Sequence, residues 1–268
     1  MSGVLVGAVA YDPKAVTIWE GIREFFRTRP LDLDFILFSN YEAQVEALFR
    51  GWIDIAWNTN VAWVRTKARS KGAARALAMR DTDVGFTTKL IARARSGILG
   101  PEDLRGKTLA LGSRDSAQAA ILPVHFLTQA GLAEGRDYRA LRFDVDVGKH
   151  GDTGTSELEV LKAVVEGRAE AGAIGSATWA MLLGTGRLDR KAFEAVWTSP
   201  AYCHCNFTTL TLDDARSKQF TEALLAMDYG DPRWSLLMDL EGLKSWVVGR
   251  SEGYEALESS LADQGLLG

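Results

Sequence analysis

Short apolar runs alternate along the chain with segments in which apolar residues recur every three or four positions. The runs at residues 4–10, 33–38 and 53–57 predict buried strands. The periodic segments at residues 15–27 and 41–50 predict amphipathic helices between them. Strands that alternate with helices in this way predict an α/β fold with mostly parallel sheets.

The alternation continues through the second half of the chain. A helix, a glycine and a strand that carries an acidic residue occur in this order twice, at residues 47–56 and 163–172. This repeat predicts two similar lobes, and we expect Asp54 in the first copy to anchor neighbouring backbone. The later strands are expected at residues 76–80, 87–94, 108–111, 140–147, 169–174, 192–198 and 207–212.

The turn after residues 108–111 is a candidate binding site. Gly112 and the polar residues behind it lead into a helix that Asp115 or Ser116 is expected to cap. A helix N-terminus behind a small polar turn presents backbone N–H groups to an anion. An ordinary strand-to-helix turn is the alternative.

Composition narrows the function classes. The 268 residues carry 31 basic and 35 acidic side chains, a net charge of −4, so nucleic acid is not an expected partner. Apolar runs are shorter than a membrane span requires. The first ten residues lack a basic leader region. The expected location is therefore cytoplasmic, or periplasmic or extracellular if a leader has been removed.

The segment Cys203-His204-Cys205 offers unusual chemistry. The two cysteines are too close in sequence for a normal disulfide. Alternation of side chains along an extended segment predicts Cys203 and Cys205 on one face and His204 on the other. Three hypotheses remain open: a nucleophile or general base, a metal site completed by other side chains, or buried cysteines beside a structural histidine. The side chains considered for completing a metal site are His150, Asp152 and Glu157.

Other candidates follow predicted strands. Asn58, Asn60 and Tyr11 come after the carboxyl ends of strands, where α/β folds bind ligands. The glycine-rich segment 148–156 is expected to be either a lid or a plain surface loop. Ser156 is expected to cap the helix behind it, with Glu159 completing a capping box.

Four motifs together resemble one family. They are Gly51-Trp52-Ile53-Asp54-Ile55-Ala56-Trp57, Asp103-Leu104-Arg105-Gly106-Lys107-Thr108-Leu109-Ala110, Glu166-Gly167-Arg168-Ala169-Glu170-Ala171 and Trp197-Thr198-Ser199-Pro200. The chain resembles the phosphonate-binding, type II periplasmic solute-binding proteins of ABC importers. The resemblance implies two α/β lobes with a ligand cleft between them, lobe 1 from residues 1–86 and 203–268 and lobe 2 from 87–202. The hinge crossings would lie near residues 84–90 and 199–206.

The resemblance also implies ligand contacts, most of which differ in this chain. Tyr41 matches a cleft aromatic of the family. The family's Ser-Thr-Ser cradle for phosphonate oxygens is replaced by Ser116, Ala117 and Gln118. Phe86, followed by Thr87, replaces a tyrosine, and Glu157 replaces a histidine unless His150 takes that place. Cys205 stands where the family has an acid.

These replacements argue against an alkylphosphonate ligand. Fewer donors converge on the oxygens, and a carboxylate at Glu157 would repel a dianion. The residues Trp57, Trp63, Phe86 and Tyr202 are expected to offer flat apolar surface. An aromatic ligand with one anionic group is therefore expected to fit better.

The function expected from these observations is binding of a small anionic molecule, with an ABC transporter permease as partner if the protein is exported. The alternative is a cytosolic enzyme on the same fold, similar in kind to chorismate dehydratases or thiamine-precursor synthases. It would use Cys205, His204 and Glu157 as acid, base or nucleophile. A cytosolic ligand sensor is a third hypothesis. No cofactor is expected, and the predicted set of site residues includes no metal ligands.

Overall fold

The computed structural model describes residues 3–267, which form two compact lobes. Lobe 1 comprises residues 3–85, 203–255 and 267, and lobe 2 comprises 86–202 and 256–266. The chain passes between lobes after residues 85, 202, 255 and 266. The first two crossings fall within residues 84–90 and 199–206.

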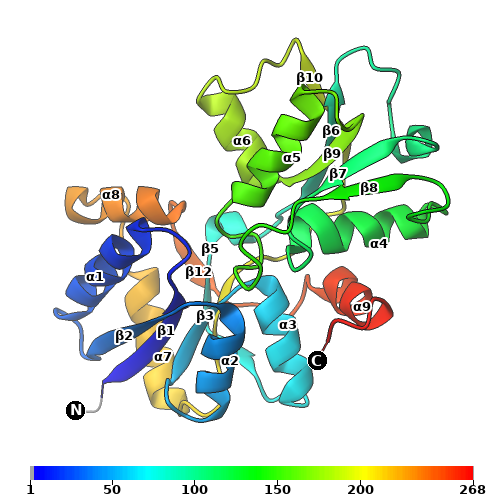
Figure 1. Cartoon of the computed structure of the whole chain (residues 1–268). Helices are drawn as coiled ribbons and strands as arrows, with labels where there is room; N and C mark the ends of the chain where they lie inside the picture. Colours follow the sequence, from blue (N-terminus) through cyan, green and yellow to red (C-terminus); the bar gives the residue numbers. More distant parts are fainter. Residues whose placement is uncertain (1–2, 268) are drawn as a thin grey trace. The chain divides into compact units, whose positions relative to one another are not determined.

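Lobe 1 contains a five-stranded sheet and a two-stranded sheet (Figure 1). Most of its predicted elements appear within two residues of their expected ends. Its strands are β1 (Val4–Val9), β2 (Leu33–Phe38), β3 (Ile55–Asn58), β4 (Arg75–Ala76), β5 (Ala78–Arg80), β11 (Asn206–Thr209) and β12 (Trp246–Val248). Its helices are α1 (Lys14–Phe26), α2 (Tyr41–Phe49), α3 (Asn60–Arg69), α7 (Asp214–Leu225) and α8 (Pro232–Glu241).

Lobe 2 contains a second five-stranded sheet. Its strands are β6 (Thr88–Arg93), β7 (Thr108–Leu111), β8 (Arg139–Arg142), β9 (Ala171–Gly175) and β10 (Phe193–Thr198). Its helices are α4 (Leu122–Gln129), α5 (Thr155–Val165) and α6 (Ser176–Gly184), and α9 (Glu255–Asp263) joins them. A π-helical turn, Ala117–Ile121, precedes α4.

The two five-stranded sheets have the same strand order. Lobe 1 runs β2-β1-β3-β11-β4, and lobe 2, from its other edge, runs β8-β7-β9-β6-β10. In each sheet the first three strands are parallel, whereas the last two pairings are antiparallel. The two-lobed α/β fold with mostly parallel sheets is confirmed, because four of the five strands in each sheet run in the same direction. The reversed strands are β11 in lobe 1 and β6 in lobe 2, each antiparallel to both of its neighbours.

Both sheets bury apolar side chains on their two faces. In lobe 1, helices α1, α7 and α8 supply one core with residues such as Ile18, Phe220 and Met238, while Leu48 of α2 belongs to a smaller cluster on β1 and β3. In lobe 2, Leu127 of α4 and Val164 of α5 belong to separate clusters. These cores hold the carboxyl ends of the parallel strands in place.

The repeated acidic positions perform the same structural task in both lobes. Asp54 accepts a hydrogen bond from the Leu5 N–H at 2.8 Å, and Glu170 accepts one from the Thr108 N–H at 2.7 Å. Each carboxylate, one residue before its strand, thus ties that strand to the neighbouring parallel strand, β1 in lobe 1 and β7 in lobe 2. The expectation that Asp54 anchors backbone is confirmed.

Three expectations about local structure are wrong. Helix α5 begins at Thr155, with Gly154 as its N-cap, so Ser156 lies inside the helix and does not cap it. Strand β8 ends at Arg142, before residues that turn away from the sheet. Residues 256–266 pack with lobe 2, because the Ser260 hydroxyl and the Gln264 amide both donate to the Ile121 carbonyl at 3.2 Å.

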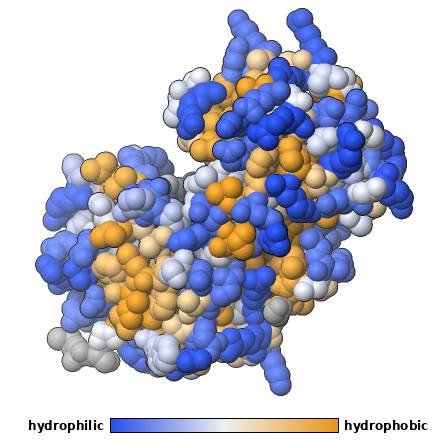
Figure 2. Space-filling model, in the orientation of Figure 1, coloured by the Kyte–Doolittle hydropathy of each residue, from blue (hydrophilic) through white to orange (hydrophobic). Residues whose placement is uncertain are grey.

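On the face shown in Figure 2, hydrophilic residues predominate and hydrophobic ones form separate patches. Of the helices between residues 3 and 267, none combines the length and the hydropathy of a membrane span.

Candidate functional site

The turn between β3 and α3 in lobe 1 carries a group of buried polar side chains. Thr59 is the N-cap of α3, and its hydroxyl accepts a hydrogen bond from the Ala62 N–H at 3.2 Å. Asn58 ends β3, and Asn60 begins the ten-residue helix. Both asparagines are buried, so their amides face protein rather than bulk solvent.

Three hydrogen-bond donors at this turn are buried without a partner in residues 3–267: Asn58 Nδ2, Asn60 Nδ2 and Trp63 Nε1. Asn60 and Trp63 are three residues apart and therefore share a face of α3. An unpartnered buried donor is unfavourable by about 1–3 kcal/mol, so such groups need an explanation.

The neighbours of Asn58 and Asn60 determine whether the amide oxygen or the amide nitrogen of each side chain can bind a ligand. Gln44 Nε2 donates to the Trp57 carbonyl at 3.0 Å and to Asn58 Oδ1 at 2.8 Å. Asn60 Oδ1 accepts from the Val61 N–H at 2.9 Å. Because each amide oxygen is already engaged, each asparagine is left with its N–H₂ group to offer.

An aromatic residue and a second strand complete this donor group. The Trp63 ring packs against Tyr254 with 5.8 Å between ring centroids, and Asn206 Nδ2 donates to the Tyr254 hydroxyl at 3.0 Å. Asn206 is the cross-strand neighbour of Asn58. Burial raises the pKa of Tyr254 far above its usual range, so its phenol stays neutral. We call Asn58, Asn60 and Trp63 the α3 donor group.

The corresponding turn in lobe 2, between β9 and α6, has no buried side-chain donor left without a partner in the described part of the chain. The Gly175 N–H donates to Glu157 Oε2 at 2.7 Å, and Gln118 Nε2 donates to Glu157 Oε1 at 3.1 Å. Glu157 is 2% exposed. A carboxylate of the chain itself therefore occupies the position at which a helix N-terminus would meet an anion.

The turn after β7 is likewise satisfied internally. Ser116 caps the π-helical turn by accepting from the Ala119 N–H, as the sequence predicts. The Ser113 hydroxyl donates to Asp115 at 2.6 Å, and the N–H groups of Gly148 and His150 donate to the other Asp115 oxygen at 2.5 and 3.4 Å. These bonds fasten the glycine-rich loop to the turn at two points.

The structure places the remaining predicted residues in different surroundings. The ring centroids of Phe86 and Tyr202 lie 5.7 Å apart, and a Cβ atom at Gly175 would stand 3.1 Å from side-chain atoms of Phe86 and Gln118, a tight contact. Thr87 exchanges hydrogen bonds with Ser176. Ala117 is fully buried, and Tyr11 and Tyr41 pack in one apolar cluster of lobe 1.

The expected aromatic surface is not formed as predicted. Trp57 packs in the lobe 1 core, with its ring centroid 4.5 Å from that of Phe207 and 5.8 Å from that of Trp246. Trp63 and Tyr202 are also buried, and the Tyr202 hydroxyl lies 3.0 Å from that of Thr88. Phe86 remains half-buried. The Trp57, Trp63 and Tyr202 rings are buried because large aromatic side chains stabilise the fold when their apolar area is removed from water.

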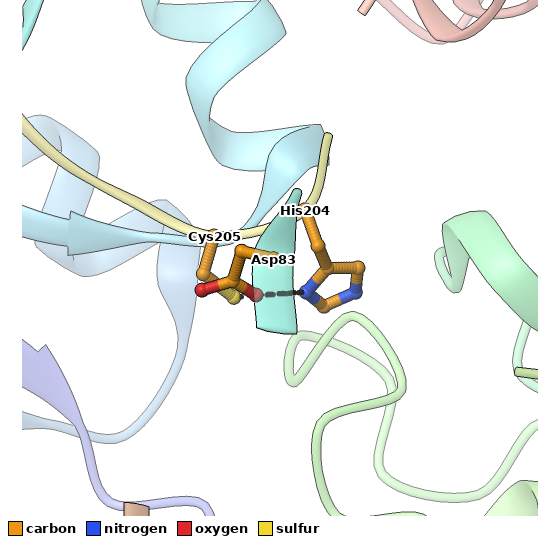
Figure 3. A group of neighbouring side chains, drawn as sticks. All are labelled: Asp83, His204 and Cys205. Carbon is orange, nitrogen blue, oxygen red and sulfur yellow. Dashed lines mark hydrogen bonds and ion pairs between the residues drawn. The ribbon is translucent and has the colours of Figure 1, made fainter. Parts of the chain in front are cut away.

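A second polar cluster in lobe 1 joins Asp83, His204 and Cys205 (Figure 3). His204 Nδ1 lies 3.0 Å from Cys205 Sγ and 3.5 Å from Asp83 Oδ1. All three side chains are buried. Because one ring nitrogen faces both neighbours, the arrangement differs from a catalytic triad, in which the two nitrogens of the imidazole contact different partners.

The predicted alternation of faces in this segment is wrong. Residues 203–205 are not part of a strand, since β11 begins at Asn206. Backbone N–H groups of Cys203 and His204 donate to the carbonyls of Gly253 and Asp83 at 2.7 and 2.9 Å. The Cys203 thiol lies against Gly253, whereas the side chains of His204 and Cys205 converge.

Arg80 fixes the charge of Asp83. Its guanidinium donates to the two carboxylate oxygens at 2.7 and 2.8 Å and reaches Glu241 Oε1 at 3.3 Å. Burial favours the neutral acid, but the Arg80 charge and hydrogen bonds from His204 and Arg80 outweigh it and lower the pKa of Asp83 to about 2. Asp83 is therefore ionised at neutral pH.

A surface hollow of about 500 Å³ lies elsewhere in lobe 1, at the amino end of β1. It is lined in part by Arg23, Asp34 and Asp54. Arg23 pairs with Asp34 at 3.3 Å, and Asp54 is engaged with the Leu5 backbone. Because these charges are already satisfied, the hollow is a weaker candidate than the α3 donor group.

Sequence reasoning missed Asp83, Trp63 as a polar donor, and Gln44. Arg80 and Asp83 stand three residues apart, a spacing typical of a local ion pair. That spacing was the available signal for Asp83. No local pattern reveals that Gln44 orients Asn58, because the two side chains come from different elements.

Comparison with known proteins decides the family. The family model described as "ABC transporter, phosphonate, periplasmic substrate-binding protein" matches residues 13–254. The chain belongs to this family. A curated member, the probable ABC transporter phosphite binding protein PhnD1 of Prochlorococcus marinus (strain MIT 9301), is 20% identical over 247 residues, which cover 88% of this chain and 80% of PhnD1.

Solved structures of similar proteins have the same fold. PhnD1 in complex with methylphosphonate superposes with a TM-score of 0.74 at 19% identity, covering 98% of each chain. XAC2383 of Xanthomonas citri bound to ATP gives a TM-score of 0.73 at 19% identity, also covering 98% of each chain. The periplasmic aliphatic sulphonate binding protein SsuA of Escherichia coli gives 0.64 at 14% identity, covering 100% of this chain and 94% of SsuA.

Proposed function

We propose that this protein is a solute-binding protein that captures a small oxyanion. Membership of the phosphonate-binding family supports this class of function. A methylphosphonate complex and a sulphonate-binding protein are among the structures with the same fold. The family places the chain among binding proteins rather than enzymes, so the enzyme alternative is not proposed.

The observation that carries the proposal is the α3 donor group. Asn58 Nδ2, Asn60 Nδ2 and Trp63 Nε1 are all donors, all buried, and all without a partner in the described part of the chain. They lie at the positive end of the α3 dipole. Oxygen atoms of an anion would satisfy these donors, and hydrogen bonds to a charged acceptor contribute about 1.5–3 kcal/mol each.

The character of these donors favours a singly charged group. All three belong to neutral side chains. Desolvating a dianion is strongly unfavourable unless cationic groups compensate for it. A sulfonate, a carboxylate or a monoanionic phosphonate is therefore the expected ligand group, and a phosphate dianion is not.

Lobe 2 supports the same assignment. Glu157 occupies the Gly175 N–H, and Asp115 occupies the donors of the loop after β8. We infer that these carboxylates exclude a second anionic group from lobe 2. The predicted site residues Ser116, Gln118, His150 and Glu157 would then keep an anionic group out of lobe 2 instead of cradling its oxygens.

The family description implies a transport partner and a compartment. We propose that the protein serves an ABC importer and acts outside the cytoplasm, as the description of its family states for that family. Co-purification with a permease complex in reconstituted membranes would test the partner. Fractionation of cells that produce the full natural gene product would test the compartment.

Isothermal titration calorimetry tests the ligand class. The probes are methanesulfonate, benzoate, methylphosphonate and inorganic phosphate, with methylphosphonate titrated at pH values on both sides of its second ionisation. Binding of a monoanion that weakens as methylphosphonate becomes a dianion is expected. Tight binding of the phosphate dianion would overturn the singly charged assignment, and failure of every probe would overturn the proposed function.

A further inference from the structure

The Asp83, His204 and Cys205 cluster has the composition of a metal site. A thiolate, an imidazole nitrogen and a carboxylate oxygen are the usual protein ligands of zinc. The three candidate ligand atoms lie within 4.8 Å of one another. The cluster lies wholly in lobe 1 and is separate from the α3 donor group assigned above.

The distances fit a tetrahedral ion. Bonds of about 2.0 Å to nitrogen and oxygen and about 2.3 Å to sulfur place the ligand atoms roughly 3.3–3.6 Å apart. His204 Nδ1 is 3.0 Å from Cys205 Sγ and 3.5 Å from Asp83 Oδ1. Small rotations of the side chains would therefore bring the three atoms around one ion, as their orientations in Figure 3 indicate.

The surrounding groups fit as well. Arg80 donates to both oxygens of Asp83, which is how an outer partner orients a carboxylate ligand. With Cys205 as a thiolate, the cluster holds three negative charges, on Cys205, Asp83 and Glu241, and one positive charge on Arg80. A divalent cation would neutralise the two negative charges that Arg80 leaves unbalanced. Because the cluster is buried, unbalanced charge there would be strongly destabilising.

We propose that Asp83, His204 and Cys205 form a site for a soft divalent cation of the zinc class, with a fourth position left for water or a ligand group. Binding breaks the S–H bond of Cys205, forms a metal–sulfur bond and releases the proton to solvent. His204 binds through Nδ1, so its ring proton resides on Nε2. Arg80 acts as a positioning residue through Asp83.

Cobalt(II) titration of the purified protein tests this site, because a cobalt–thiolate bond has a characteristic charge-transfer absorption. One Co²⁺ per chain is expected, with this absorption present and displaced by Zn²⁺. Cys203→Ser is the matched control, since Cys203 lies one residue from His204 but points to Gly253. It should retain the absorption, whereas Cys205→Ser should abolish it and weaken binding more than about a hundredfold.

A second measurement keeps the test decisive if Cys205→Ser fails to fold. In the Cys203→Ser background Cys205 is the only thiol, and the rate at which a thiol reagent modifies it can be followed with and without Zn²⁺. Protection of Cys205 by one equivalent of Zn²⁺ is expected. Unchanged reactivity, or cobalt absorption that persists in Cys205→Ser, would overturn the site. Neither the cobalt absorption nor the protection of Cys205 depends on oxyanion binding. The metal site and the oxyanion site can therefore be disproved independently of each other.

Discussion

The turn after β3 in lobe 1 and the turn after β9 in lobe 2 occupy the same place in sheets of the same strand order, yet they differ in electrostatic character. In lobe 1 the side-chain donors of Asn58, Asn60 and Trp63 have no partner among residues 3–267. In lobe 2 the Gly175 N–H is already bound to the Glu157 carboxylate. A single side chain from a neighbouring helix, Glu157 of α5, can therefore close to an anion a turn whose counterpart in the other lobe remains open.

The buried carboxylates of the two lobes also differ. Asp83 in lobe 1 is paired with the charge of Arg80, whereas the hydrogen bonds described for Glu157 come from the neutral donors Gly175 and Gln118. This contrast predicts that loss of the Asp83 charge destabilises the fold, whereas loss of the Glu157 charge changes which anions bind.

Replacing Asp83 by asparagine should destabilise the protein by about 3–5 kcal/mol, because Arg80 would be left buried without its charged partner. Urea unfolding of wild type and Asp83→Asn measures the change. Asp34→Asn is the matched control, since its ion pair with Arg23 is exposed and should contribute less than about 1 kcal/mol. Equal losses in both variants would contradict the role of Asp83.

Replacing Asn60 by aspartate should weaken methanesulfonate binding by more than about a hundredfold, because a carboxylate replaces an N–H donor while its oxygen can still accept from the Val61 N–H. A negative charge at the start of α3 should also keep or raise the melting temperature. Asn40→Asp changes the N-cap of α2 in the same way and should leave affinity unchanged. Calorimetry with methanesulfonate on both variants measures the two affinities. Equal affinities in Asn60→Asp and Asn40→Asp would contradict the role of Asn60.

Acid should remove the contribution of Asp83 to stability. Its pKa is lowered from 3.8 to about 2, a difference worth about 2 kcal/mol at 1.36 kcal/mol per unit. A lowered pKa stabilises the folded state above the ordinary value and loses that effect as the pH falls through the folded value. The free energy of unfolding attributable to Asp83 should therefore decrease between about pH 4 and pH 2. The difference between wild type and Asp83→Asn across this range measures it, and a constant difference would count against the low pKa.

Replacing Trp63 by phenylalanine removes the indole N–H and keeps an aromatic ring against Tyr254. Methanesulfonate binding should weaken about tenfold, the effect of losing one hydrogen bond to a charged acceptor. Trp52→Phe serves as control, because Trp52 is an exposed tryptophan of the same lobe. Equal affinities in wild type and Trp63→Phe would remove Trp63 from the donor group.

Replacing Glu157 by glutamine should change methanesulfonate affinity by less than about threefold, because the amide oxygen can still accept from the Gly175 N–H. The larger change should be in selectivity. Loss of the negative charge should improve binding of the methylphosphonate dianion relative to the monoanion. An unchanged ratio of the two affinities would show that Glu157 does not control ligand charge.

The fold could be predicted from the sequence because its signals are local. The acid in Gly51-Trp52-Ile53-Asp54 and its counterpart Glu170 recur with the same spacing, and each ties its strand to the neighbouring parallel strand. Ser116 caps the turn that follows it, as expected. Ser156 was misassigned because Gly154, in a left-handed conformation with φ of 68°, ends the loop two residues earlier.

The candidate site was only partly predictable because its properties arise from tertiary contacts. The sequence nominated Asn58 and Asn60 but could not indicate that Gln44 and the Val61 N–H fix their orientation. It nominated His204 and Cys205, and proposed His150, Asp152 and Glu157 as their companions. The structure supplies Asp83 instead, which lies over a hundred residues away in sequence and is brought close by the backbone bond from His204 to its carbonyl.

The central claim is that an oxyanion binds to the α3 donor group. The most direct test follows the indole N–H resonances of the tryptophans by ¹⁵N-resolved NMR during a methanesulfonate titration, with Trp63→Phe identifying the Trp63 signal. The account predicts that the Trp63 signal moves with the same dissociation constant that calorimetry gives, while the exposed Trp52 signal stays in place. Saturable binding that leaves the Trp63 resonance unmoved would contradict it.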